Sequence, residues 1–202
     1  MRDLHRAAVA LALLALAIGC AKPVPAPPPP PPAPPAAPPP PACERVARIE
    51  VRKSARTLIA ECDGGARLVF PVALARERGP KQRAGDLRMP EGESRIAGGA
   101  HASRFGLFLP IDYPSAADAA RGVVAGVISR EEYDAIVRAH ERGAPPPQDT
   151  ALGGHLGLHG EGTRWRGDLD LDWTEGCVAL ADEAIDRLAR LVARGTPVRI
   201  TP

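Results

Sequence analysis

Two short segments contain the residue types that thiol-based catalysis requires. One holds His159-Gly160 and the other holds Gly176-Cys177, with the cysteine eighteen residues after the histidine. A cysteine becomes a nucleophile when a neighbouring group favours its thiolate, and histidine is suited to accept that proton near neutral pH. Backbone N–H groups beside a glycine can approach a developing oxyanion closely. The two segments therefore predict a cysteine nucleophile and a histidine base, provided that the fold brings them together.

A metal site is the alternative for the same region, because His155, His159 and Cys177 are all possible ligands. The nearby glycines disfavour a helix, so we predict that residues 152–159 form a strand. Four strand residues separate His155 from His159 by about 13 Å, too far for one small ion. We therefore predict no metal, with His155 on the surface or the cleft wall.

Two of the other cysteines flank a predicted hairpin. Residues 45–52 and 57–61 are expected to form its strands, and a turn centred between residues 52 and 53 places Cys43 opposite Cys62. An exported protein can keep a disulfide. We predict a Cys43–Cys62 bridge. Because Cys20 is expected to carry lipid, this pairing leaves Cys177 as the odd, reactive thiol.

The first 42 residues are predicted to direct and tether the chain. Residues 1–19 contain Arg2 and Arg6 before an apolar run that is too short to span a bilayer, which is typical of a signal peptide. The run ends in Ala17-Ile18-Gly19-Cys20 and resembles a bacterial lipobox, so we expect Cys20 to be lipidated after cleavage. An ordinary cleaved signal is the alternative. Ala21 follows the cysteine, which by resemblance favours an export route to the outer membrane, facing the periplasm.

The predicted tether covers residues 20–42. Fourteen of the 24 prolines lie between Pro23 and Pro41, so this segment is expected to be an extended polyproline spacer. Nineteen such residues at about 3.1 Å each reach roughly 60 Å. The alternative is a linker whose length has no function.

Charge excludes one class of partner for the remaining domain, residues 43–202. The tethering region holds three basic residues and one acidic residue, which leaves 23 of each sign in the domain. A domain of zero net charge is not expected to bind nucleic acid through a basic face. It is also not expected to bind a membrane through a polybasic patch, so membrane attachment is assigned to the lipid on Cys20.

Mostly β elements with two or three helices predict a β-rich, α+β single domain. Strands are expected at residues 66–74, 105–111 and 198–200, and a loop at 79–92. Ser129 and Glu132 form a capping-box pattern before a helix that ends at Gly143. Asp182 is expected to cap a final helix that ends at Gly195. The core must be aliphatic, because the whole chain has only seven aromatic residues.

The catalytic residues resemble a known family. His159-Gly160 followed by Thr174-Glu175-Gly176-Cys177-Val178 is similar to the signature of the L,D-transpeptidase (YkuD-type) catalytic domain. The resemblance covers roughly residues 45–202. Weaker matches occur at Lys81, Gly85-Asp86, Pro90-Glu91-Gly92 and Gly195-Thr196-Pro197-Val198. Stretches that resemble the YafK-like branch are Ser103-Arg104-Phe105, Tyr113-Pro114, Trp173-Thr174 and Cys177-Val178-Ala179.

Four residues depart from the usual pattern of that family. Met89 replaces a threonine, Ser94 an aromatic residue, Glu175 a histidine or small residue, and Ala179 an arginine. The nucleophile and the histidine are intact. These changes therefore concern substrate choice, because they alter groups expected to line the cleft.

The resemblance implies a mechanism on peptidoglycan stem peptides. Cys177 would attack the carbonyl between the third and fourth residues and release the terminal D-amino acid. His159 would take the thiol proton and the Gly160 carbonyl would orient the imidazole, as the third group of a triad does. Backbone N–H groups of Gly176 and Cys177 would hold the oxyanion. The family needs no metal, and we expect no cofactor.

The sequence leaves the reaction's outcome open. An amine acceptor would give a cross-link or an attached protein. Water would give an L,D-endopeptidase or carboxypeptidase, including one that detaches peptidoglycan-linked lipoprotein. A non-catalytic wall-binding lipoprotein is the alternative of another class, and a lowered Cys177 pKa would favour the enzyme over it.

Overall fold

A computed structural model of the chain describes residues 42–162 and 172–202. The predicted signal peptide (1–19), Cys20 and nearly all of the predicted tether (20–42) lie outside these residues. In the described ranges, no helix combines the length and the apolar character needed to cross a membrane.

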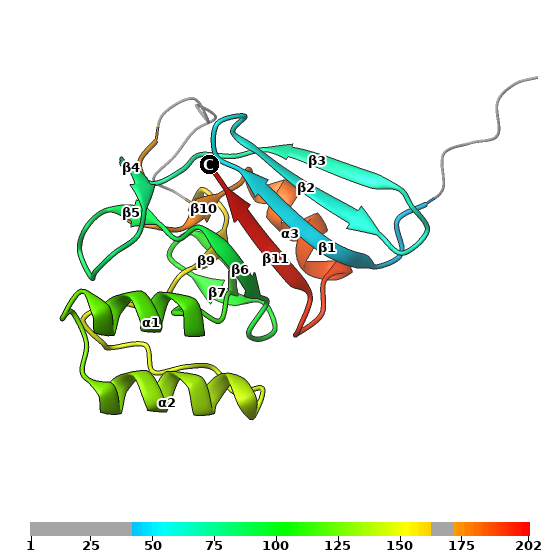
Figure 1. Cartoon of the computed structure of the whole chain (residues 1–202). Coiled ribbons are helices and arrows are strands. Elements are labelled where there is room, and N and C mark those ends of the chain that lie inside the picture. The colour runs from blue at the N-terminus through cyan, green and yellow to red at the C-terminus, as the bar shows by residue number, and fades with distance from the viewer. Residues whose placement is uncertain (1–41, 163–171) are drawn as a thin grey trace, which may run out of the picture. The chain divides into compact units, whose positions relative to one another are not determined.

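The predicted hairpin starts a five-stranded sheet (Figure 1). Its strands are β1 (Val46–Arg52), β2 (Thr57–Cys62), β3 (Arg67–Pro71), β6 (Gly92–Arg95) and β11 (Pro197–Thr201), in the order β3-β2-β1-β11-β6. β1 and β11 are parallel, and the other neighbours are antiparallel. Alternate residues of β2 and β11 are buried, as expected for strands with one face on a core.

The hairpin turn lies two residues further along than predicted. Arg52 pairs with Thr57, so the turn occupies residues 53–56 and Cys62 pairs with Val46. The segment before β1 nevertheless brings Cys43 to Cys62, and the two form a disulfide with Cα atoms 5.4 Å apart. A register irregularity between Val46 and Arg48 accompanies this arrangement.

A four-stranded sheet positions the two catalytic segments. Its order is β10 (Val178–Ala179), β9 (Gly157–His159), β8 (Gly106–Pro110) and β7 (His101–Ser103). β9 and β10 are parallel, with Ala179 opposite His159 and Val178 opposite Leu158. Because Cys177 immediately precedes β10 and His159 ends β9, this pairing brings the cysteine and the histidine to one place.

Two predicted boundaries in this part of the chain were wrong. The strand expected over 152–159 is confined to β9, because Gly153 (φ 84°) and His155 (φ 55°) have left-handed backbone angles that interrupt a strand. The loop expected over 79–92 contains most of a small parallel pair, β4 (Glu77–Pro80) with β5 (Arg88–Met89).

The described residues of the domain form three helices: α1 (Ala116–Val124), α2 (Arg130–Glu141) and α3 (Asp182–Leu191). α1 and α2 pack against each other, and α3 packs against β8 and β9. Ser129 caps α2 with Glu132 as predicted, and Ser115 with Asp118 caps α1 in the same way. The prediction for α3 was wrong at its start: Ala181 is the N-cap and makes no side-chain cap bond. Asp182 instead accepts hydrogen bonds from the N–H groups of Glu161 and Gly162.

The core is mainly aliphatic, as the composition predicts. Its fully buried members include Ile49, Leu58, Leu158, Leu180 and Leu188, with Tyr113 and Met89 as larger additions. The β-rich α+β class is therefore confirmed, and the side chains of β9, β10 and α3 anchor the site in this core.

Candidate active site

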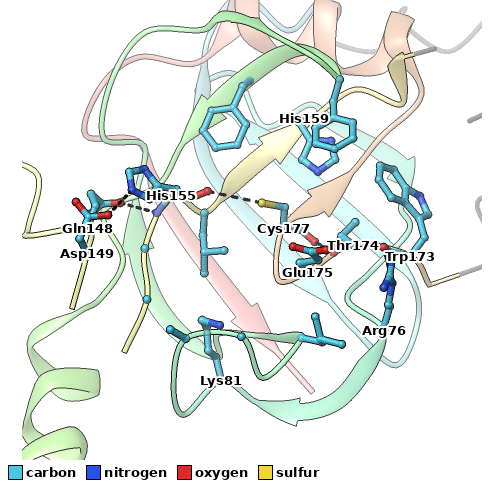
Figure 2. A pocket seen from close by; sticks show the side chains of 18 of the residues that line it. Arg76, Lys81, Gln148, Asp149, His155, His159, Trp173, Thr174, Glu175 and Cys177 are labelled. Carbon is cyan, nitrogen blue, oxygen red and sulfur yellow. Dashed lines mark hydrogen bonds and ion pairs between the residues drawn. The ribbon is translucent and has the colours of Figure 1, made fainter. Parts of the chain in front are cut away.

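The cysteine and the histidine share one cleft of about 590 Å³ (Figure 2). Figure 2 shows His159 above Cys177, with Trp173 on one side and His155 on the other. Cys177 is partly exposed at the cleft and His159 is buried. A nucleophile that substrate can reach and a sheltered base are the arrangement that covalent catalysis needs.

The orientation of the His159 ring is fixed by a backbone group. Nδ1 lies 2.6 Å from the carbonyl oxygen of Gly160. A carbonyl only accepts, so Nδ1 carries the hydrogen and donates it, which leaves Nε2 of the neutral ring as the basic nitrogen. The structure thus places Gly160 in the position predicted for the third member of a triad.

Aromatic side chains surround the imidazole. Phe105 stacks on it with ring centroids 4.6 Å apart, Trp173 meets it edge-on at 5.6 Å, and Phe108 lies at 6.4 Å. Burial among these groups lowers the pKa of His159, although the Gly160 carbonyl acts in the opposite direction. The ring is therefore neutral, and able to accept a proton, at neutral pH.

The resting thiol is protonated. Loss of hydration among the surrounding protein atoms raises the pKa of Cys177 to about 11, with the Gly157 backbone N–H and the Lys81 ammonium acting against this and Glu175 adding to it. This direction is opposite to the lowered pKa that we expected to favour an enzyme over a wall-binding lipoprotein, so the thiol is not a preformed thiolate and catalysis is supported by the geometry of the site instead. Sγ lies 4.0 Å from the backbone carbonyl of His155, to which the thiol points. With a neutral thiol and a neutral imidazole in one cleft, the thiolate forms when the thiol passes its proton to the base.

The loop before the nucleophile is held by Thr174. Its Oγ1 donates to the Cys177 carbonyl at 2.7 Å and accepts from the Gly176 N–H at 3.4 Å. Gly176 has φ 141°, and a Cβ there would lie 2.9 Å from the Arg88 carbonyl, so only glycine fits. The predicted oxyanion role of Gly176 requires the long bond to Thr174 to give way to substrate.

His155 forms the wall opposite this loop. Its ring Nε2 lies 3.0 Å from Asp149 Oδ1, and its backbone N–H donates to Gln148 Oε1 at 2.7 Å. Across the described residues, no group of three or more His, Cys, Asp or Glu side chains could hold a metal ion. His155 lines the cleft, which is one of the two places that the sequence predicted for it.

Several cleft residues were not assigned a catalytic-site role from the sequence. Of the aromatic residues in the described ranges, three gather around His159, although only Trp173 lies near the cysteine motif. Arg76 lies in no motif at all and reaches the cleft by a backbone bridge between Ala75 and Thr174. No local pattern signals such a long-range pairing, so the fold was needed to find it.

Comparisons with known proteins agree with this geometry. The family described as YkuD, the L,D-transpeptidase catalytic domain, matches residues 46–200. No curated protein matches the chain.

Solved structures show a related fold. A variant of the helical cell shape determining protein Pgp2 from Campylobacter jejuni gives a TM-score of 0.53 at 18% identity, over 78% of this chain and 47% of that one. A second Pgp2 structure from that organism gives 0.53 at 17%, over 77% and 47%. An L,D-transpeptidase from Enterococcus faecium gives 0.46 at 14%, over 78% and 50%. The chain thus spans about half the length of these structures.

Proposed function

Because the chain belongs to the YkuD family of L,D-transpeptidase catalytic domains, we propose that it acts on peptidoglycan stem peptides through a thioester on Cys177. The observation that supports this most directly is the parallel pairing of β9 with β10, which brings Cys177 into the cleft of His159. The fixed tautomer of His159 adds to it, because it leaves Nε2 as a base. A wall-binding protein without catalysis would not need that arrangement.

The first half-reaction follows from these groups. As the Cys177 sulfur attacks the carbonyl of the third stem-peptide residue, its proton passes to Nε2 of His159. The C–S bond forms, the peptide C–N bond breaks, and the imidazolium returns the proton to the departing amine. The products are a thioester and a free terminal D-amino acid. The N–H groups of Gly176 and Cys177 hold the oxyanion between these two steps.

The second half-reaction resolves the thioester. A neutral amine that attacks it forms a C–N bond, the C–S bond breaks, and the proton lost from nitrogen reaches the sulfur through His159. We propose such a transfer, giving a cross-link or an attached protein, as the main outcome. Attack by water would instead give hydrolysis, including detachment of peptidoglycan-linked lipoprotein.

We also propose a place in the cell envelope and a branch of the family. The lipobox-like Ala17-Ile18-Gly19-Cys20 supports a lipid anchor, and the proline-rich segment supports a spacer between that anchor and the domain. Together they fit a protein held on the outer membrane that faces the periplasm. Trp173-Thr174 and Cys177-Val178-Ala179 support the YafK-like branch. Pgp2, whose fold resembles that of this chain, is a helical cell shape determining protein, and such a role is consistent with an activity on the cell wall.

The test is incubation of the full chain with a disaccharide tetrapeptide, alone and with an amine acceptor, with products identified by mass. We expect release of the terminal D-residue and, with the acceptor, a new amide product. Both should vanish in Cys177→Ala. Release without transfer would assign hydrolysis, and cleavage of only a lipoprotein-linked muropeptide would assign the detaching activity. Binding without any Cys177-dependent product would favour a wall-binding lipoprotein.

A further inference from the structure

Two oppositely charged residues lie side by side on the cleft wall next to the nucleophile. Ala75 and Thr174 form a parallel bridge, and the Arg76 N–H donates to the Thr174 carbonyl at 3.1 Å. Neighbouring segments in such a bridge run about 4.8 Å apart, so the next residue of each, Arg76 and Glu175, is also brought alongside. Both side chains line the cleft that contains Cys177.

One hydrogen bond positions the Arg76 guanidinium and leaves its other donors available. Its Nε donates to the Trp173 carbonyl at 3.1 Å, which leaves the two terminal nitrogens for a ligand. Glu175 is exposed and lies two residues before Cys177. Over residues 42–162 and 172–202, no ion pair joins Arg76 to Glu175, and Glu175 makes no side-chain hydrogen bond. Figure 2 shows Arg76 below Trp173 and Glu175 below Cys177, with His155 and Asp149 across the cleft from Arg76.

Within the described part of the chain, the other charged groups that line the cleft are engaged elsewhere. Lys81 donates to the Asp86 carboxylate at 2.9 Å and to the Arg83 carbonyl at 3.1 Å. Asp149 pairs with His155. Arg104 lies over the Phe105 ring, 4.7 Å from its centroid, on the wall beside His159. Arg76 and Glu175 are thus the adjacent, opposite charges that face substrate beside the nucleophile.

We propose that Arg76 and Glu175 form a subsite for the zwitterionic head of an α-amino acid. The planar guanidinium suits a carboxylate, and the Glu175 carboxylate suits an ammonium group. An α-amino acid has both charges on one carbon, so a single small ligand satisfies both side chains. The role of this ligand rests on the proposed function: it is the terminal D-amino acid that leaves, or an amino acid acceptor whose ammonium group passes one proton to the Glu175 carboxylate before the neutral amine attacks the thioester. The departure of Glu175 from the family pattern would then set the preference for the acceptor.

Direct binding tests the subsite without turnover. The full chain with Cys177→Ala is titrated, by NMR at low salt, with D-alanine, D-lactate and D-alaninamide. D-Lactate lacks the ammonium group and D-alaninamide lacks the carboxylate. The same titrations are made with Glu175→Gln and Arg76→Gln added. Glu183→Gln and Arg187→Gln, on the exposed face of α3, remove matched charges away from the bridge between Ala75 and Thr174.

We expect D-alanine to bind at least tenfold more tightly than either analogue. Glu175→Gln should abolish the preference over D-lactate, Arg76→Gln the preference over D-alaninamide, and the α3 variants neither. Equal affinities for the three compounds, or preferences that survive both cleft substitutions, would overturn the subsite. Release of the D-residue from tetrapeptide by the unmodified chain is measured in parallel. If that release is absent while the binding pattern holds, the proposed enzyme falls and the subsite stands.

Discussion

The guanidinium of Arg56 donates two hydrogen bonds of 2.7 Å each to the Asp172 carboxylate. Arg56 lies in the β1–β2 turn, and Asp172 lies five residues before the nucleophile. One oxygen of Asp172 also accepts from the Leu74 N–H at 3.0 Å, while the N–H groups of Trp173 and Thr174 donate to the Leu74 carbonyl. The five-stranded sheet thereby fixes the start of the loop that presents Cys177.

We predict that Asp172→Asn misplaces this loop. The pair is only partly exposed, and a hydrogen bond to a charged group contributes about 1.5–3 kcal/mol, so the free energy of unfolding should fall by about 1–2 kcal/mol. Small displacements of a nucleophile are costly, so Cys177-dependent release of the D-residue should slow by roughly tenfold or more. Urea denaturation and a release assay measure the two effects.

The matched control is Asp63→Asn. Arg45 and Asp63 also form an ion pair, but through one contact, and both side chains are more exposed and lie at the base of the hairpin. An exposed pair contributes about 0–1 kcal/mol, and activity should not change. If Asp172→Asn proved no more harmful than Asp63→Asn in either assay, the anchoring role would be wrong.

A second prediction concerns Gly160. A Cβ at this position would lie 2.3 Å from Asp182 Oδ1 and 2.6 Å from the Phe105 carbonyl, and both are too close. Gly160→Ala should therefore shift the carbonyl that orients His159. We expect a loss of about 1–3 kcal/mol in stability and roughly a hundredfold in turnover. Gly99→Ala is the control, because a Cβ there meets no atom within 4 Å. Equal behaviour of the two variants would contradict the steric argument.

Local patterns predicted most of the secondary structure and the two catalytic segments. The hairpin, the final strand and the Ser129–Glu132 capping box follow from periodicity and turn chemistry, and the structure contains them. Helix α1 was missed, although Ser115 three residues before Asp118 is a capping signal.

The features that the sequence did not predict depend on contacts between distant segments. The aromatic shell of His159, the bridge that brings Arg76 to Glu175, and the raised pKa of Cys177 all arise from packing. The interruption before β9 depends on left-handed backbone angles at Gly153 and His155. Gly153-Gly154 is a local turn signal, but the positive φ of His155 is set by its surroundings in the fold.

The Cys43–Cys62 disulfide gives a third prediction. It closes a loop with a sequence separation of 19, and loops of this size contribute about 3 kcal/mol by restricting the unfolded chain. Replacing both cysteines with serine should lower the free energy of unfolding by about 2–4 kcal/mol. The bridge lies at the hairpin base rather than in the cleft, so turnover below the unfolding transition should be retained. A variant of full stability would contradict this, as would a wild-type protein in which mass spectrometry found both thiols free.

A last prediction concerns pH, because the two catalytic groups shift in opposite directions. Burial lowers the pKa of His159 below 6.5 and raises that of Cys177 to about 11. kcat/KM reports the essential groups of the free enzyme, so its acid limb should lie below pH 6.5. Alkylation of Cys177 by iodoacetamide should rise with pH until about 11.

Stability should show the same two shifts. At pH values between the lowered pKa of folded His159 and 6.5, the unfolded chain binds more protons than the folded chain. The contribution of His159 to the free energy of unfolding is therefore complete above pH 6.5 and is lost as pH falls. Between 9.0 and about 11 the folded chain holds the Cys177 proton more tightly, so stability is lost as pH rises through that window. His159→Gln should remove the acid effect alone, and Cys177→Ala the alkaline effect alone. An alkylation midpoint below pH 8 would instead mean a preformed thiolate–imidazolium pair, in which case the proton would move before substrate binds rather than during attack.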